Sequence, residues 1–135
     1  MKDVEIIEPD YFEDERGWLL KVLKQENIGK NTFGEIYITT AFPGITKARH
    51  YHKYTTEWFC VIKGTAKLVL QDIESMERKE IVMGTSRFIT VKIPSGIAHA
   101  IKNIGNETMY LIAVANQPYN PQQPDTCPYE LNIND

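Results

Sequence analysis

The chain has 135 residues, 42% of them hydrophobic, and a formal net charge of -3, so it is long enough for one domain with a core and too short for two. It has no lysine- and arginine-rich block, which argues against a nucleic-acid partner, and no apolar run that approaches membrane-spanning length. The start, MKDVEIIEPDYF, lacks the apolar stretch of a signal peptide, and the two cysteines are interpreted as reduced thiols. These features predict a cytoplasmic protein with no membrane partner.

Short strands follow one another along almost the whole sequence. β-branched and aromatic residues dominate them, glycine and proline fall between them, and no segment keeps a helical period. In chain order the expected strands are 4–8, 18–24, 34–42, 46–52, 57–63, 65–73, 77–83, 88–93, 97–103 and 108–115. This pattern predicts an all-β sandwich or barrel in which residues 1–135 form a single domain. The proline-rich residues 117–135 are expected to form an extended C-terminal arm over the barrel or a neighbouring subunit.

The strand expected at 57–63 is apolar on both faces. Phe59 and Val61 should line the interior together with Glu57, while the alternate residues on the other face are also apolar. Cover for that outer face would come from a second sheet, from the arm or from a partner subunit. Together with the long arm, this strand predicts a homodimer.

All three histidines of the chain can be placed at one metal ion. His50 and His52 lie two residues apart on an expected strand, so their imidazoles point to the same side. Residues 53–56 can turn, so that Glu57 opens a strand running back beside the first, and His99 would complete the set. Three imidazoles and a carboxylate suit a first-row divalent ion, and they leave one or two positions for water or substrate. Zinc is expected first, with nickel, iron or manganese as alternatives. The competing interpretation is that these side chains keep the pattern without holding a metal.

The spacing of these residues resembles the two sequence motifs of the cupin superfamily. The first motif is resembled by Gly44, five residues, His50-x-His52, four residues, Glu57, six residues and Gly64. The core of the second is resembled by Pro94-x-Gly96, two residues, His99, three residues and Asn103. The resemblance implies a double-stranded β-helix, the cupin jelly roll, with His50, His52, Glu57 and His99 converging inside.

Other stretches resemble nucleotide-sugar 3,5-epimerases of the dTDP-4-dehydrorhamnose type. The residues Asp14-Glu15-Arg16-Gly17 match the D-x-R-G of that family, and Lys47-Ala48-Arg49-His50 stands where the family has R-G-x-H. The chain looks most like the cupin domain at the C-terminal end of capsular polysaccharide reductase–epimerases. That likeness lies at Phe33-Gly34, Thr40 to His52, Ile93 to Glu107, Ala115-Asn116, Tyr119-Asn120-Pro121 and Pro124-Asp125-Thr126. It implies a cytoplasmic homodimer that acts on nucleotide-activated sugars, with zinc in the capsule branch.

The resemblance also suggests residues that contact the substrate. Arg16, Lys47 and Arg49 are candidates for ligand phosphate contacts, because arginine and lysine both bind phosphate. Arg16 could instead cap a turn in an acidic loop. Lysine at position 47 lacks the planar fork of the family's arginine.

The catalytic base has two possible assignments. His50 falls on the family's catalytic histidine, and His52 falls on a position that is usually glutamine in the family. If a metal is bound, His50 is a ligand and the base is Glu57, Tyr110 or Lys47; without metal, His50 can be the base. Tyr110 is the nearest candidate for the family's acid tyrosine, although a packing role in the sheet is the competing interpretation.

The expected function is that of a metal-binding cupin enzyme, an epimerase or isomerase of a nucleotide-linked keto-deoxysugar in surface polysaccharide biosynthesis. One alternative is a metal-dependent sugar-phosphate isomerase of the cupin type, whose ligand pattern is much the same. Another is a cupin that binds a sugar or a metal without catalysis.

Overall fold

The computed structural model of the chain describes residues 1–30 and 32–133. Its elements, in chain order, are β1 (Glu5–Ile7), β2 (Asp10–Asp14), β3 (Gly17–Lys21), α1 (Gln25–Ile28), β4 (Glu35–Ala41), β5 (Thr46–His52), β6 (Glu57–Lys63), β7 (Thr65–Asp72), β8 (Arg78–Gly84), β9 (Thr90–Ile93), β10 (Ile97–Asn103), β11 (Met109–Ala115) and β12 (Thr126–Pro128). The predicted all-β class is confirmed. Within the described residues, no helix is long and apolar enough to cross a bilayer.

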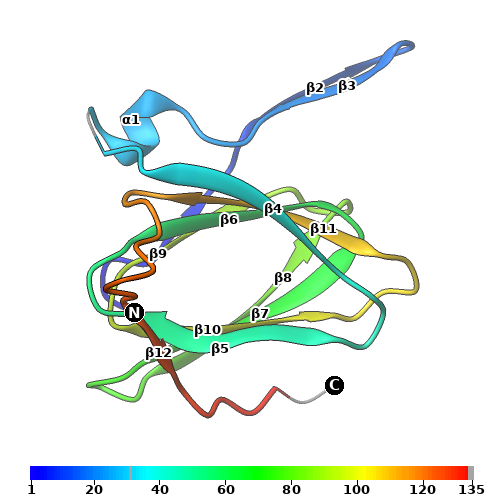
Figure 1. The fold of residues 1–135 in the computed structure, drawn as a ribbon. Coiled ribbons are helices and arrows are strands. Elements are labelled where there is room, and N and C mark those ends of the chain that lie inside the picture. The colour runs from blue at the N-terminus through cyan, green and yellow to red at the C-terminus, as the bar shows by residue number, and fades with distance from the viewer. Residues whose placement is uncertain (31, 134–135) are drawn as a thin grey trace.

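Two antiparallel five-stranded sheets face each other, as Figure 1 shows. One sheet has the strand order β1-β9-β6-β11-β4, and the other has the order β12-β5-β10-β7-β8. Side chains that alternate along the strands fill the space between the sheets, with Leu68, Val91 and Leu111 almost completely buried there. This arrangement confirms the predicted jelly roll.

Strand β6 is buried on both of its faces, as its sequence predicts. Phe59 and Val61 belong to the core between the sheets, and Trp58 and Cys60 are buried on the opposite face. Part of the outer cover comes from the segment that includes α1, which lies over this sheet (Figure 1) and accepts a 2.6 Å hydrogen bond from Thr90 Oγ1 at the Val22 carbonyl. The covers expected from the sequence are a second sheet, the arm or a partner subunit, and this N-terminal segment is not among them.

A β-hairpin formed by β2 and β3 projects away from the barrel (Figure 1). Tyr11 and Trp18 of the hairpin pack with Phe88, with ring centroids 5.2 to 6.1 Å apart. The sequence predicts a strand at 18–24 and a loop for the acidic residues before it, but those residues form strand β2. Cross-strand aromatic contacts stabilise this hairpin despite its acidic side chains.

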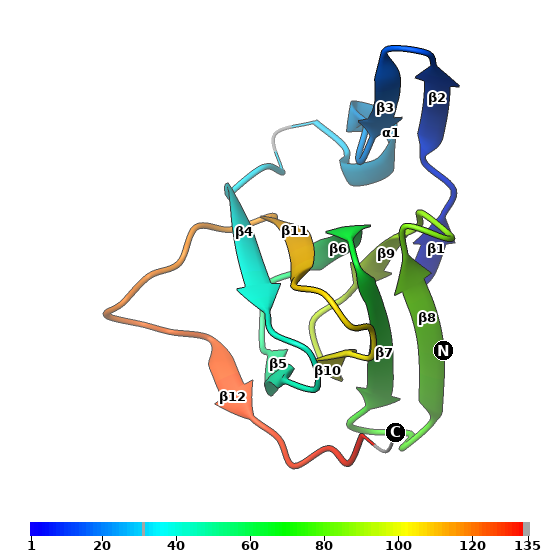
Figure 2. The same ribbon diagram turned by 90° about the vertical axis from the view of Figure 1, so that its right-hand side faces the viewer.

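The C-terminal segment leaves β11, loops outward and returns beside β5 as β12 (Figure 2). In this short ladder Thr126 pairs with His52 and Pro128 with His50. Leu131 then packs against Val69 and Ala100 on the outer face of the second sheet and is 1% exposed. The arm therefore lies on the barrel of its own chain; the last residues of the expected arm, 134–135, lie outside the described residues.

Candidate functional site

A bulge in β5 turns the first two histidines toward the interior. His50 pairs with His99 of β10, but Ala48 pairs with the next residue, Ala100, so Arg49 has no Cα partner on β10. Ala48 (φ 76°) and Arg49 (φ 63°) both take the left-handed backbone conformation. Because cross-strand partners share a face of the sheet, the extra residue places His50 on the interior face with His99.

Glu57 reaches the site from the other sheet. It is the first residue of β6, which pairs with β9 and β11. The expectation that β6 runs back beside β5 is therefore wrong: residues 53–56 cross from one sheet to the other. The carboxylate still meets the histidines, because the two sheets face each other and β5 ends where β6 begins.

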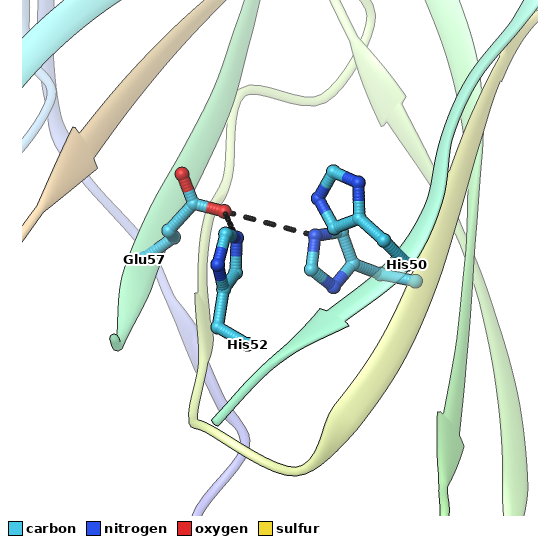
Figure 3. Close-up of side chains that lie close together, drawn as sticks. His50, His52 and Glu57 are labelled. Atoms are coloured by element: carbon cyan, nitrogen blue, oxygen red, sulfur yellow. Dashed lines mark hydrogen bonds and ion pairs between the residues drawn. The ribbon is translucent and has the colours of Figure 1, made fainter. Parts of the chain in front are cut away.

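The three imidazoles and the carboxylate form one compact cluster. One ligand atom from each of His50, His52, Glu57 and His99 lies within 4.8 Å of the others. The Glu57 Oε1 atom is 2.9 Å from His52 Nε2 and 3.7 Å from His99 Nε2. Figure 3 shows the Glu57 carboxylate and the His50 and His52 rings pointing into the same part of the interior, with Glu57 in contact with His52. The predicted convergence of the four residues is present in the structure.

Further partners fix the orientation of the buried members of this cluster. The His99 Nδ1 atom lies 3.0 Å from the Ile97 carbonyl oxygen, so it carries the proton and donates it there. The Tyr37 hydroxyl donates a 2.7 Å hydrogen bond to Glu57 Oε2. On the far side of its ring, His52 Nδ1 lies 3.1 Å from Asp125 Oδ1. Neither Tyr37 nor Asp125 was a predicted site residue, and the only signal for Asp125 was the Pro124-Asp125-Thr126 likeness.

The protonation preferences differ within the cluster. Burial lowers the pKa of His99 to about 4, and it also lowers the pKa of His50, with His52 adding to the effect. Burial opposes protonation of His52 as well, but hydrogen bonds to Glu57 and Asp125 raise its pKa above the usual value. Burial alone would raise the pKa of Glu57, yet hydrogen bonds from His52 and Tyr37 lower it. His52 and Glu57 therefore favour an imidazolium–carboxylate pair.

The donor set fits a divalent cation. His99 Nε2 is fully buried and has no hydrogen-bond partner among the described residues. An unsatisfied buried acceptor is costly, and coordination of a cation would satisfy it. Three imidazole nitrogens and one carboxylate oxygen are ligands typical of zinc and its neighbours in the first row.

The cluster opens into a cavity of about 590 Å³, a size suited to a small-molecule ligand. The walls come from β4, the crossing 53–56, the end of β11 and the C-terminal segment. The lining residues are Glu35, Tyr37, Lys53, Tyr54, Thr55, Ala115, Gln117, Pro118, Tyr119, Asn120, Gln123, Pro124, Asp125 and Thr126, together with His50, His52 and Glu57. Lys53 is the one lysine or arginine among these described lining residues.

The remaining predicted residues do not line this cavity. Lys47 donates hydrogen bonds to Thr39 Oγ1 at 2.5 Å and to the Thr40 carbonyl at 3.0 Å, so it ties β5 to β4 of the other sheet. Tyr110 is on β11, where it pairs with Thr40 of β4 and Lys63 of β6. Its side chain is exposed, whereas its neighbours Met109 and Leu111 are in the core.

The two predicted arginines also lie away from the cluster. Arg49 is exposed at the bulge. Arg16 is at the turn of the projecting hairpin, where its guanidinium pairs with Asp14. Within a single chain, neither arginine belongs to the cavity.

A jelly roll whose facing sheets enclose three histidines and a glutamate at this spacing defines a cupin. The family model described as the polysaccharide biosynthesis C-terminal domain matches residues 12–127, and the chain belongs to this family.

One sequence relative and two solved structures illustrate the relationship. The chain is 34% identical to the UDP-2-acetamido-2,6-beta-L-arabino-hexul-4-ose reductase of Pseudomonas aeruginosa over 84% of its own length and 29% of that protein. It is similar to the capsular polysaccharide assembling protein CapF of Staphylococcus aureus, with 31% identity, a TM-score of 0.70, and coverage of 73% of this chain and 27% of that one. A dTDP sugar isomerase from Desulfovibrio desulfuricans shares the fold, with a TM-score of 0.86, 20% identity, and coverage of 96% and 85%. The predicted kinship with sugar-nucleotide and capsular polysaccharide cupins is confirmed.

Proposed function

We propose that the chain is a cupin enzyme that epimerises or isomerises a nucleotide-linked keto-deoxysugar in polysaccharide biosynthesis. The observation that supports it most is the cluster of His50, His52, Glu57 and His99, whose ligand atoms lie within 4.8 Å of one another beside a cavity of about 590 Å³. The similarity to a dTDP sugar isomerase and to a UDP-sugar reductase supports the substrate class.

We further propose that these four residues hold a divalent ion, with zinc the first candidate. When bound, such an ion would act as a Lewis acid toward the oxygen of a keto sugar. The Ile97 carbonyl binds His99 Nδ1, which leaves His99 Nε2 directed at the cluster. The Tyr37 hydroxyl binds Glu57 Oε2, which leaves Glu57 Oε1 directed at the cluster.

Epimerisation beside a ketone requires removal of a proton from the neighbouring carbon and its return on the other face. Of the proposed bases, His50 and Glu57 line the cavity, whereas Lys47 and Tyr110 do not. In the metal-free chain His50 is suited to the task, because burial lowers its pKa and keeps the imidazole neutral at pH 7. If His50 holds a metal, Glu57 is the candidate that remains, with its second oxygen bonded to Tyr37.

The homodimer remains a proposal. Ile36 and Ile38 of β4 are exposed, as are Phe12 and Leu19 of the projecting hairpin. A second copy of the chain would cover these apolar side chains. Light scattering at micromolar concentration should show a dimer; a monomer would contradict this part of the proposal.

The proposed activity is tested with dTDP- and UDP-linked 4-keto-6-deoxyhexoses in D₂O. Mass spectrometry should show deuterium uptake at the carbons beside the ketone for the zinc-loaded protein. His50→Asn should abolish the uptake, whereas Asp72→Asn, which changes a turn outside the cavity, should not. Turnover of simple sugar phosphates without uptake into the nucleotide sugars would favour the sugar-phosphate isomerase instead.

A further inference from the structure

Asp125 connects the C-terminal segment to the histidine cluster. Its Oδ2 atom accepts three hydrogen bonds, from Tyr54 N at 3.0 Å, Thr55 N at 2.9 Å and Thr55 Oγ1 at 2.8 Å. Its backbone carbonyl accepts a further bond from Lys53 N at 3.1 Å. These bonds fix the carboxylate on the crossing that joins β5 to β6, and they leave Oδ1 directed at His52.

His52 is held between two carboxylates. Its Nδ1 atom is 3.1 Å from Asp125 Oδ1, and its Nε2 atom is 2.9 Å from Glu57 Oε1. A carboxylate that accepts the Nδ1 proton fixes the tautomer whose Nε2 lone pair points to a metal, and loss of such a partner typically lowers metal affinity 10- to 100-fold. Asp125 is therefore placed to orient the ring and to keep Nε2 directed at the cluster.

The same residue holds one wall of the cavity in place. The residues between β11 and β12 that line the cavity are Gln117, Pro118, Tyr119, Asn120, Gln123, Pro124 and Asp125. This wall is tied near its start by a 2.7 Å bond from Tyr119 N to Glu35 Oε1, and at its end by the bonds of Asp125. Asp125 is thus shared between the wall and the cluster.

We infer that Asp125 is a positioning residue that couples docking of the C-terminal segment to metal binding at the cluster. The inference rests on the proposed metal site. Coupling between two binding events is reciprocal. A metal held with the help of Asp125 should hold residues 117–128 more firmly on the barrel, and a docked segment should raise the affinity of the cluster for the metal.

Substitutions at Asp125 separate the two roles. Asp125→Asn keeps an amide oxygen that can accept from Tyr54 and Thr55, but its NH₂ group cannot accept the His52 Nδ1 proton. Asp125→Ala removes both sets of bonds. Asp72→Asn is the matched control, because Asp72 Oδ1 also accepts backbone N–H bonds in a turn but does not line the cavity.

The test uses the full chain, stripped of metal with a chelator. Calorimetric titration with Zn²⁺ gives the Kd for zinc, and mass spectrometry monitors the hydrogen exchange of residues 117–128 with and without zinc. Zinc should slow exchange in the wild-type segment, and Asp125→Asn should raise the Kd for zinc 10- to 100-fold while the metal-free variant melts near the wild type. Asp125→Ala should also speed exchange without zinc, and Asp72→Asn should keep the wild-type Kd.

The outcomes distinguish this inference from the metal site itself. A wild-type Kd in Asp125→Asn, or tail exchange that zinc leaves unchanged, would overturn the coupling while the metal site stands. A wild-type chain that binds no zinc would overturn the proposed metal site together with the coupling.

Discussion

His50 and His99 are direct cross-strand partners, on β5 and β10, with ring centroids 4.7 Å apart. Their distance is set by the ladder of a sheet and does not depend on the long stretch of chain between them. His99 is completely buried, while His50 opens to the cavity. His99 therefore contacts only the interior of the protein, whereas His50 can contact a ligand in the cavity.

The buried member should make the metal-free chain sensitive to acid. The pKa of His99 is about 4 in the folded chain and about 6.5 in an unfolded one, so between these values the unfolded chain binds a proton that the folded chain does not. The free energy of unfolding should therefore fall as the pH drops from 6.5 to 4, by about 3 kcal/mol from this residue. Urea denaturation of chelator-treated protein at pH 7 and pH 4.5 measures the loss.

His99→Gln should flatten this pH dependence, because no proton can be taken up at that position. His52 acts in the opposite direction: its pKa is raised in the folded chain, so its contribution is present at low pH and is lost as the pH rises through that value. An equally steep acid loss in His99→Gln would show that another group is responsible.

His52→Gln tests how metal and chemistry are linked, because glutamine is the residue usual at this position in the metal-free epimerases that the chain resembles. We expect the zinc content of the variant and its deuterium exchange with solvent to fall together, since the oxygen of the substrate would lose its Lewis acid. Activity that survives without zinc would identify His50 as the base. Unchanged zinc content would show that His52 is not a ligand.

Ala48→Gly should stabilise the chain. Ala48 has a φ of 76°, a conformation that glycine adopts at little cost and that is strained for alanine. Relief of this strain should add up to about 1 kcal/mol to the free energy of unfolding, measured by thermal or urea unfolding. The control is Ala100→Gly, the same change at the partner residue across the ladder, which should lose about 1 kcal/mol.

Gly34→Ala should dislodge the start of the C-terminal segment. A Cβ atom at position 34 would overlap the backbone of Gln117, and the carbonyl of Ala115, two residues earlier, accepts a 2.8 Å bond from Gly34 N. We expect a loss of roughly 1–3 kcal/mol and faster hydrogen exchange in residues 117–126. Gly105→Ala, where the nearest atom would lie at 3.5 Å, should stay within about 0.5 kcal/mol of the wild type.

The strands and the ligand cluster could be predicted because both depend on short-range patterns. The β-branched and aromatic residues of the strands, and the fixed spacing of His50, His52 and Glu57, can be recognised without knowledge of the packing. The partner of β6 could not be predicted, because residues 53–56 are compatible with either a hairpin turn or a crossing between sheets. The acidic strand β2 was missed for a related reason, since its stabilising contacts with Trp18 and Phe88 come from other elements.

The residues that orient the cluster, Asp125 and Tyr37, could not be predicted from the sequence either. Asp125 is 73 positions from His52 in the sequence, and Tyr37 is 20 positions from Glu57. An aspartate in a proline-rich tail and a tyrosine in a strand have ordinary local explanations. Only the tertiary fold reveals that both carry hydrogen bonds to the cluster.

Strand β12 also protects the solubility of the barrel. It pairs with the outer side of β5, so β5 is an interior strand of its sheet. A chain shortened before residue 117 would leave the backbone groups on one edge of β5 unpaired, while the other edge stays paired with β10. An unpaired edge invites strand addition from other molecules. Loss of the C-terminal segment should therefore cause self-association of the protein, in addition to any effect on the cluster.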